Sequence, residues 1–209
     1  SGSLGSPKFV RLSKKNLKSN SNSIIKYLKI KSEDVTITTM PFSYSYMLSI
    51  INTFLESGAC IVACQHSLIE KKFWSQFKKN KITSLSGVPY IYEMFIKLGL
   101  EKIYISSLKT LTQAGGKLND DLIKKMIEFS KDKKINFYTM YGQTEASPRI
   151  SFLNYLNAEK KIGSIGKAIP NTKMWLEDEK GKLIKKPGIT GELIFKGNNV
   201  SLGYCNNIK

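Results

Sequence analysis

Two kinds of apolar periodicity alternate through the middle of the chain, and this alternation limits the folds open to it. Short apolar segments rich in strand-forming residues lie at 35–39, 59–64, 82–87, 108–113 and 135–140. The segments between them carry apolar residues at helical spacing, at 44–57, 70–81, 88–99 and 120–133. Strands that alternate with helices are typical of an α/β fold. The sequence therefore predicts a mainly parallel, layered sheet flanked by helices.

Residues that commonly start and stop helices stand at the ends of the helical segments. Gly58 and Gly99 each follow such a segment, and glycine is the usual residue just past a helix end. Pro89 stands near the first turn of segment 88–99, where a missing N–H costs nothing. Asn119 precedes segment 120–133, and its side chain can cap that helix.

The pattern changes after Gly142. From Gly163 onward there is no long helical stretch; "TKMWLED" and "GELIFKG" indicate short strands, and "EKGK" indicates a turn between them. We expect one domain in two portions, an α/β portion over residues 1–162 and a β-rich portion over residues 163–209.

The charge and the cysteines argue against some classes of function. The net charge is +17, but Arg11 and Arg149 are the only arginines, and the lysines are scattered rather than gathered in one arm. We interpret them as a solvated surface and expect no nucleic-acid partner. The spacing of Cys60, Cys64 and His66 matches no common zinc motif, so we interpret the cysteines as structural. No apolar run is long enough for a membrane span, and we expect a cytoplasmic protein.

Two predicted strands run into glycine-marked segments, "QAGGKL" at 113–118 and "YGQTE" at 141–145. Ligands bind beyond the carboxyl ends of strands in open parallel sheets. Gly115 and Gly116 lack Cβ atoms, so a flat ring can lie close to the backbone, and Tyr141 can stack on that ring. Thr144 offers a hydroxyl to phosphate, and Glu145 offers a hard oxygen to Mg²⁺. The alternative is that the glycines are ordinary turn residues and Glu145 a helix cap or an ion-pair partner.

The first ten residues, "SGSLGSPKFV", are rich in glycine and serine and contain Lys8. A loop of this kind can surround anionic oxygens with backbone N–H groups and bring an ammonium group to them. It is not a Walker A loop, because G-x-x-x-x-G-K-[ST] is absent. The alternative is that "SGSLGS" is a cloning linker.

Five motifs follow one another in the order and spacing of one known family. They are S-G-[ST]-T-G-x-P-K at 1–8, a glycine pair before a helix at 115–116, Y-G-x-T-E at 141–145, G-S-[VI]-G-K-x-[LI]-P at 163–170 and G-E-L-x-x-[KR]-G-x-x-[VM]-x-x-G-Y at 191–204. On these motifs the chain resembles the adenylate-forming (AMP-binding) enzymes: acyl-CoA synthetases, peptide-synthetase adenylation domains and luciferases. The resemblance covers nearly the whole chain, and segment 87–95 also has a counterpart there.

The resemblance implies ATP-dependent activation of a carboxylic acid. The carboxylate attacks the α-phosphorus of ATP, pyrophosphate leaves, and an acyl-adenylate remains. The acyl group then passes to a thiol of coenzyme A or of a phosphopantetheine-bearing acyl carrier protein. ATP and Mg²⁺ are therefore the expected cofactors, because positioned donors and a metal ion must control the charge of the triphosphate.

The resemblance also implies roles for individual residues. Lys8, Thr144 and Glu145 are then the catalytic group, with Glu145 as the Mg²⁺ ligand. The loop 1–8 surrounds the β- and γ-phosphates, and Gly115, Gly116 and Tyr141 hold the adenine. The full set of expected nucleotide-binding residues is Ser1, Gly2, Ser3, Gly5, Lys8, Gly115, Gly116, Tyr141, Gly142 and Thr144, and the expected substrate residues are Tyr44, Gly87, Val88 and Gly166.

Three residues depart from the family pattern. Leu4 stands where the family usually has a threonine, so one hydroxyl contact with phosphate is missing. Tyr44 stands where many acyl-CoA synthetases carry a gating histidine. Ser43 stands where peptide-synthetase domains place an aspartate against the α-ammonium of an amino acid. Without that carboxylate, we expect a substrate that lacks an α-amino group.

The resemblance further implies parts that this sequence does not contain. The aspartate that grips the ribose would lie beyond Lys209, and the strands before the phosphate loop and the small C-terminal domain with its catalytic lysine are absent. We expect a central fragment of the large N-terminal domain of an adenylate-forming enzyme, incomplete for catalysis. Two alternatives remain: a nucleotide-binding or scaffold protein that has lost catalysis, which Leu4 favours, and a basic nucleic-acid binder.

Overall fold

The computed structural model describes residues 8–99 and 105–205. Its α-helices are α1 (Lys14–Leu28), α2 (Ser45–Glu56), α3 (Lys71–Lys79), α4 (Pro89–Leu98) and α5 (Asp120–Asp132). Its strands are β1 (Val35–Ile37), β2 (Cys60–Val62), β3 (Ser84–Gly87), β4 (Thr110–Gln113), β5 (Asn136–Gly142), β6 (Arg149–Leu153), β7 (Lys167–Ala168), β8 (Lys173–Glu177), β9 (Leu183–Ile184) and β10 (Glu192–Lys196). Short 3₁₀ turns lie at Thr144–Ala146, Tyr155–Asn157 and Glu159–Lys161. No helix in these ranges is long and apolar enough to cross a membrane.

The main sheet has the strand order β2-β1-β3-β4-β5-β6-β7 within the described residues. The neighbouring pairs from β2 to β5 are parallel, while β6 and β7 join antiparallel at one edge. Each parallel step is bridged by a helix, as the alternation of the two periods predicted. The predicted α/β class with a mainly parallel sheet is confirmed.

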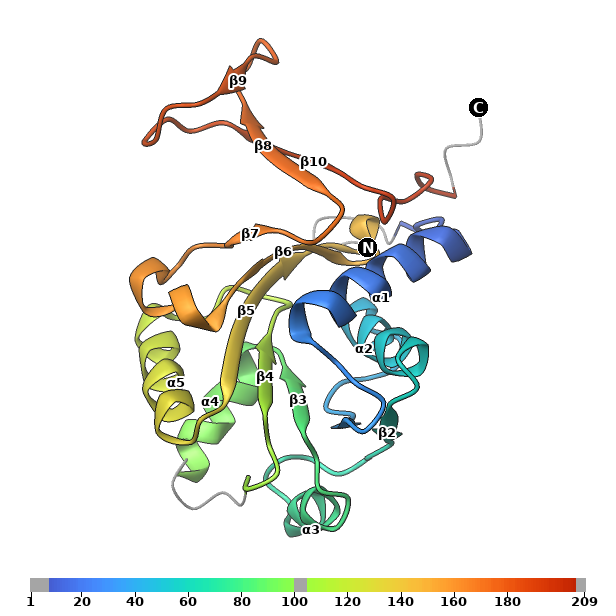
Figure 1. Ribbon diagram of the computed structural model, residues 1–209, viewed down its shortest axis with the longest axis vertical. Coiled ribbons are helices and arrows are strands. Elements are labelled where there is room, and N and C mark those ends of the chain that lie inside the picture. The colour runs from blue at the N-terminus through green and yellow to red at the C-terminus, as the bar shows by residue number, and fades with distance from the viewer. Residues whose placement is uncertain (1–7, 100–104, 206–209) are drawn as a thin grey trace.

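Helices cover both faces of this sheet (Figure 1). On one face α3, α4 and α5 pack against the sheet around Phe77, Tyr92 and Met126. On the other face α1 and α2 pack around Met47 and Phe54. Successive residues of a strand alternate between the two cores, because side chains on a strand point to opposite faces. Within β5, for example, Phe137 belongs to the first core and its neighbour Tyr138 to the second.

The predicted helix ends are confirmed. The side-chain oxygen of Asn119 accepts a hydrogen bond of 2.9 Å from the backbone N–H of Asp121, which caps α5. Pro89 is the first residue of α4, and Gly99 follows its last residue. Gly58 lies just past α2 with φ of +70°, in the left-handed region that glycine adopts at little cost.

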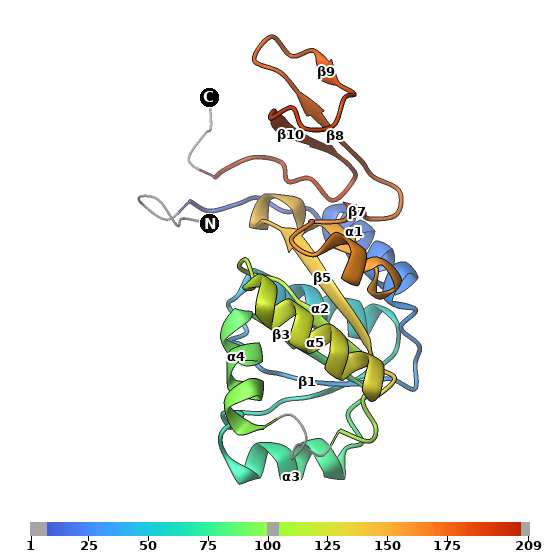
Figure 2. The same cartoon turned by 90° about the vertical axis from the view of Figure 1, so that its left-hand side faces the viewer.

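A second, antiparallel sheet of order β10-β8-β9 stands apart from the body of the molecule (Figure 2). It contains the strands expected in "TKMWLED" and "GELIFKG", which pair from Lys173 with Lys196 to Glu177 with Glu192. The preceding strand β7 belongs to the main sheet, where it pairs with β6. The division of the chain at residues 162 and 163 stays a prediction.

Strand β6 was not expected from the sequence, and neither were the two-residue strands β7 and β9. The β6 residues Arg149–Leu153 read R-I-S-F-L, so the polar–apolar alternation is only four residues long, too short to indicate a strand by itself. All five residues are buried in the structure. Strand β5 also runs two residues further than expected, through Tyr141 to Gly142, because it pairs with β6 across an irregular register there.

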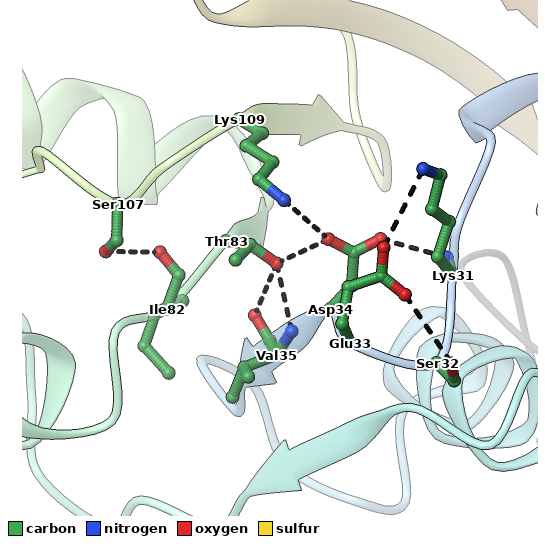
Figure 3. Close-up of polar contacts among 9 residues, drawn as sticks. All are labelled: Lys31, Ser32, Glu33, Asp34, Val35, Ile82, Thr83, Ser107 and Lys109. Atoms are coloured by element: carbon green, nitrogen blue, oxygen red, sulfur yellow. Dashed lines mark hydrogen bonds and ion pairs between the residues drawn. The ribbon is translucent and has the colours of Figure 1, made fainter.

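A polar cluster ties together the amino ends of β1, β3 and β4 (Figure 3). One carboxylate oxygen of Asp34 accepts a hydrogen bond of 2.9 Å from the Thr83 hydroxyl, and Lys109 lies 3.6 Å from that oxygen. The other oxygen accepts a hydrogen bond of 2.9 Å from the backbone N–H of Lys31. The cluster lies at the opposite end of the strands from the glycine-marked segments, so it supports the sheet away from the candidate site.

Candidate functional site

The carboxyl ends of β3, β4 and β5 meet at one edge of the sheet. The register pairs Gly87 with Gln113 and Gln113 with Thr139, so the segments that follow these strands start side by side. The Gln113 amide then donates a hydrogen bond of 2.8 Å to the carbonyl of Gly116, which holds the glycine turn. The predicted meeting of "QAGGKL" and "YGQTE" is therefore observed.

A cavity of about 550 Å³ opens at this edge, which is the size of a typical small-molecule site. We call it the strand-end cavity. Its lining includes the expected adenine residues Gly115, Gly116 and Tyr141, together with Tyr44. Lys117 and Ser164 also line it, and neither was singled out from the sequence.

A second cavity of about 400 Å³ adjoins the first, and we call it the helix-end cavity. It is lined by the first residues of α2 and by Gln143, Thr144 and Arg149. Both cavities share Tyr44, Gly115 and Gly142 in their linings. The two are thus parts of one elongated hollow, with Tyr44 at the junction.

Glycine is required at two positions of this hollow. Gly115 has φ of +79°, and a Cβ there would collide with the hydroxyl of Tyr44 and come within 3.0 Å of Val88. A Cβ on Gly142 would overlap the carbonyl oxygen of Pro148, which accepts a hydrogen bond of 2.8 Å from Gln143. The glycines therefore let the backbone close tightly, beyond the ordinary needs of a turn.

The helix-end cavity faces the amino end of α2. Tyr44 is the N-cap of this helix, and its side chain makes no capping hydrogen bond. The hydroxyl of Thr144 lies 3.3 Å from that of Ser45 in the first turn. The amino end of a helix carries a partial positive charge and backbone N–H donors. This cavity is suited to phosphate oxygens.

Glu145 and Lys8 both contact Tyr204, and neither of them lines the two cavities. The Tyr204 hydroxyl donates a hydrogen bond of 2.8 Å to Oε1 of Glu145. The ammonium nitrogen of Lys8 lies 5.0 Å from the centroid of the Tyr204 ring. Of the three expected catalytic residues, Thr144 lines the helix-end cavity, Glu145 directly follows it in the chain, and Lys8 is linked to Glu145 through Tyr204.

The donor set around Glu145 fits a magnesium ion that is bound together with phosphate. Within the described ranges, no group of three or more His, Cys, Asp or Glu side chains could hold a metal ion by itself. Mg²⁺ commonly binds through one or two carboxylates plus substrate phosphates. Glu145, beside the phosphate-suited cavity, supplies one such carboxylate.

Arg149 is a buried cation that the sequence analysis did not place at the site. Its side chain lines the helix-end cavity and is 2% exposed, and its Nε has no hydrogen-bond partner. Its guanidinium carbon lies 4.9 Å from the centroid of the Tyr46 ring, and no carboxylate in the described part of the chain forms an ion pair with it. Burial raises the pKa of Tyr46, and Arg149 opposes that rise.

The expected substrate residues do not all face the same space. Val88 touches Gly115 and lines a third cavity of about 610 Å³, on the side of β1 and β2. Gly87 is buried at the end of β3. Gly166 packs against the carbonyl of Phe152, next to a residue that lines the strand-end cavity. Among the four expected substrate residues, only Tyr44 lines both joined cavities.

Several expectations lie outside the described residues or stay predictions. The loop residues Ser1, Gly2, Ser3, Leu4 and Gly5 are not among the residues that the structure describes. The substrate roles of Gly87, Val88 and Gly166 stay predictions.

The cysteine–histidine segment shows local contacts. His66 places Nδ1 3.1 Å from Oε2 of Glu70, and the sulfur of Cys64 contacts the His66 carbonyl. No cluster able to hold a metal ion is found here or elsewhere in residues 8–99 and 105–205.

Tyr204 was missed as a site residue, although the last sequence motif ends on it. Its contact with Glu145 joins residues 59 apart in the chain. No local signal in the sequence indicates such a contact.

Comparison with known proteins identifies the family of this chain. The model of the family described as AMP-binding enzyme matches residues 1–205. An acyl-CoA ligase, sidI, of Aspergillus fumigatus is 28% identical over 99% of this chain, and indoleacetate–CoA ligase of Aromatoleum aromaticum is 26% identical over all of it. The chain spans 35% and 40% of the length of these two relatives.

A solved structure shares the fold. O-succinylbenzoate coenzyme A synthetase from Bacillus subtilis, in complex with ATP and magnesium ion, superposes with a TM-score of 0.86 at 23% identity. The match covers 99% of this chain and 42% of that one. The resemblance drawn from the five motifs is confirmed, and the chain belongs to the AMP-binding family of adenylate-forming enzymes.

Proposed function

We propose that the complete protein activates a carboxylic acid with ATP, forms an acyl-adenylate and transfers the acyl group to a thiol. The observation that carries this proposal is the continuous hollow. Its strand-end part offers Tyr141 and two close-packed glycines to a flat base, and its helix-end part offers Thr144 and the amino end of α2 to phosphate. A nucleotide has this division into an apolar ring and an anionic tail.

In this proposal the adenine lies against Gly115 and Gly116 and stacks on Tyr141. The α-phosphate lies near the Thr144 hydroxyl at the start of α2, where the N–H dipoles favour its charge. The carboxylate of the acid attacks the α-phosphorus, a P–O bond forms, and the bond to pyrophosphate breaks. Tyr44 lines both cavities at their junction, beside the α-phosphate that the acid attacks, and is the proposed substrate contact.

Glu145 is the proposed ligand of the magnesium ion that accompanies ATP. The ion would supply charge neutralisation on the phosphates that leave as pyrophosphate. Lys8 adds a cation near Glu145, because the Lys8 ammonium and the Glu145 carboxylate both contact Tyr204. The Bacillus subtilis synthetase, which shares this fold, was solved with ATP and magnesium ion, and this supports ATP and Mg²⁺ as the ligands proposed here.

Coenzyme A is the thiol acceptor that the relatives favour. The two sequence relatives are named as an acyl-CoA ligase and a CoA ligase, so we prefer coenzyme A to a phosphopantetheine carrier protein. The acid itself is proposed to lack an α-amino group. Ser43 stands at the helix-end cavity, and among the described residues that line the two cavities there is no aspartate or glutamate to pair with an ammonium group.

The test is pyrophosphate exchange into ATP by the complete protein, in the presence of a panel of aryl and alkyl carboxylic acids. The proposal expects exchange that depends on the acid and on Mg²⁺, followed by AMP release when coenzyme A is added. Tight ATP binding with no exchange for any acid would instead favour the catalytically inactive alternative. The cytoplasmic location expected from the sequence stays a prediction, which cell fractionation checks.

A further inference from the structure

Tyr204 connects three segments that are far apart in the sequence. Its hydroxyl donates to the Glu145 carboxylate at 2.8 Å, and its backbone forms an isolated antiparallel bridge with Val10, two residues after Lys8. Its ring lies under the Lys8 ammonium, 5.0 Å from centroid to nitrogen. A single side chain therefore contacts the expected metal-binding carboxylate and the expected phosphate-binding cation.

The backbone around Tyr204 is fixed independently of its side chain. The N–H of Arg11 donates to the carbonyl of Gly203 at 2.9 Å, and the N–H of Leu202 donates to the carbonyl of Arg11 at 2.9 Å. The N–H of Ser201 donates to the carbonyl of Glu145 at 2.8 Å. Removing the phenol hydroxyl leaves all these bonds in place, so the segment keeps its path when the hydroxyl is lost.

We propose that Tyr204 is a positioning residue of the metal–nucleotide site. The Tyr204 hydroxyl orients the Glu145 carboxylate toward the metal ion, and the Tyr204 ring holds the Lys8 ammonium in place. This inference rests on the proposed function, since it needs a metal-bound nucleotide beside Glu145.

The direction of the hydrogen bond suits this role. The phenol O–H donates and the Glu145 carboxylate accepts, because an ionised carboxylate has no proton to donate. A carboxylate with one oxygen held by a donor keeps a fixed orientation, and loss of such an outer partner typically weakens metal binding by about 10- to 100-fold. The ring of Tyr204 acts separately, because its face attracts the Lys8 ammonium without the hydroxyl.

The test uses Mn²⁺ in place of Mg²⁺ and measures its binding to the complete protein by electron paramagnetic resonance, with a non-hydrolysable ATP analogue present. Tyr204→Phe removes the hydroxyl and keeps the ring. We expect it to weaken Mn²⁺ binding by about 10- to 100-fold while binding of the metal-free analogue is unchanged. Tyr155→Phe is the matched control, because Tyr155 lies on a separate 3₁₀ turn, and the loss of its hydroxyl should change neither value.

A double-mutant cycle separates positioning from a general structural effect. Glu145→Gln removes the carboxylate, and in that background Tyr204→Phe should cause no further loss of Mn²⁺ binding. Tyr204→Leu, which also removes the ring, should in addition weaken binding of the metal-free analogue. Thermal denaturation without ligand shows whether each variant is folded.

The outcomes distinguish this inference from the proposed function. If the wild type binds the Mn²⁺–nucleotide pair and Tyr204→Phe binds it equally well, the positioning role is overturned and the proposed function stands. If Tyr204→Phe weakens Mn²⁺ binding to the same extent in the wild-type and Glu145→Gln backgrounds, the positioning role is also overturned. If the wild type binds no such pair, both are overturned.

Discussion

The hydroxyl of Tyr44 occupies the space in front of Gly115 that a side chain at that position would fill. The two residues come from different elements, the N-cap of α2 and the loop after β4, and both line the two joined cavities. The shape of the hollow at its junction is therefore set by a tyrosine packed against a glycine.

This relationship predicts the effect of Gly115→Ala. The left-handed backbone at φ of +79° costs about 1–2 kcal/mol for a residue with a Cβ, and the collision with Tyr44 adds to it. Gly188→Ala is a matched control, since Gly188 has φ of +78° with nothing within 4 Å of its Cβ. Urea denaturation should show a larger loss of folding stability for Gly115→Ala than for Gly188→Ala. Adding Tyr44→Phe to the Gly115→Ala variant should recover part of that difference. Equal losses would contradict the packing described here.

Thr144→Val tests the phosphate end of the hollow. A hydrogen bond to a charged group contributes about 1.5–3 kcal/mol, so removal of the hydroxyl should weaken ATP binding by roughly 10- to 100-fold. Stability should change little, because the contact with Ser45 is long at 3.3 Å. Thr190→Val, at an exposed position in the loop between β9 and β10, is the control. Calorimetric titration with ATP measures the change, and an unchanged affinity would remove Thr144 from the site.

Arg149→Met tests the buried cation. A buried charge without an ion-pair partner carries a desolvation cost, and an apolar side chain of similar volume avoids that cost. Since no described carboxylate pairs with Arg149, we expect no loss of stability in urea denaturation. A loss above about 2 kcal/mol would mean that the guanidinium contributes net stability through Tyr46 and its other neighbours.

Asp34→Ala tests the polar cluster at the amino ends of the strands (Figure 3). The variant loses the hydrogen bonds from Thr83 and from the Lys31 backbone, so the free energy of unfolding should fall by about 1.5–3 kcal/mol. Glu33→Ala is the adjacent control: Glu33 is exposed and lies 3.7 Å from Lys31, a surface pair that contributes less than about 1 kcal/mol. Nucleotide affinity should be unchanged in both variants, since the cluster lies at the other end of the strands from the hollow.

Local signals explain how much of the fold was predictable. Helical spacing, Gly58, Pro89 and Asn119 each act within a few residues, and the helices and five parallel strands they mark are all present. Strand β6 was not predicted, because the polar–apolar alternation from Arg149 to Phe152 is too short to indicate a strand by itself.

The site was predictable only in part, because local sequence signals do not reveal contacts between residues far apart in the chain. The glycine pair and "YGQTE" are contiguous in the sequence, and the parallel sheet brings their ends together. The contact of Tyr44 with Gly115 and that of Tyr204 with Glu145 join residues far apart in the chain, so the folded structure alone reveals them. The burial of Arg149 is likewise invisible in a sequence, because arginine is mostly an exposed residue.

The central claim is that the strand-end and helix-end cavities together hold one ATP molecule. A crystal structure of the complete protein with a non-hydrolysable ATP analogue and Mg²⁺ tests it most directly. We expect the adenine between Tyr141 and Gly116 and the phosphates beside Thr144 and the first turn of α2. An analogue bound elsewhere, with both cavities unaltered, would contradict the claim.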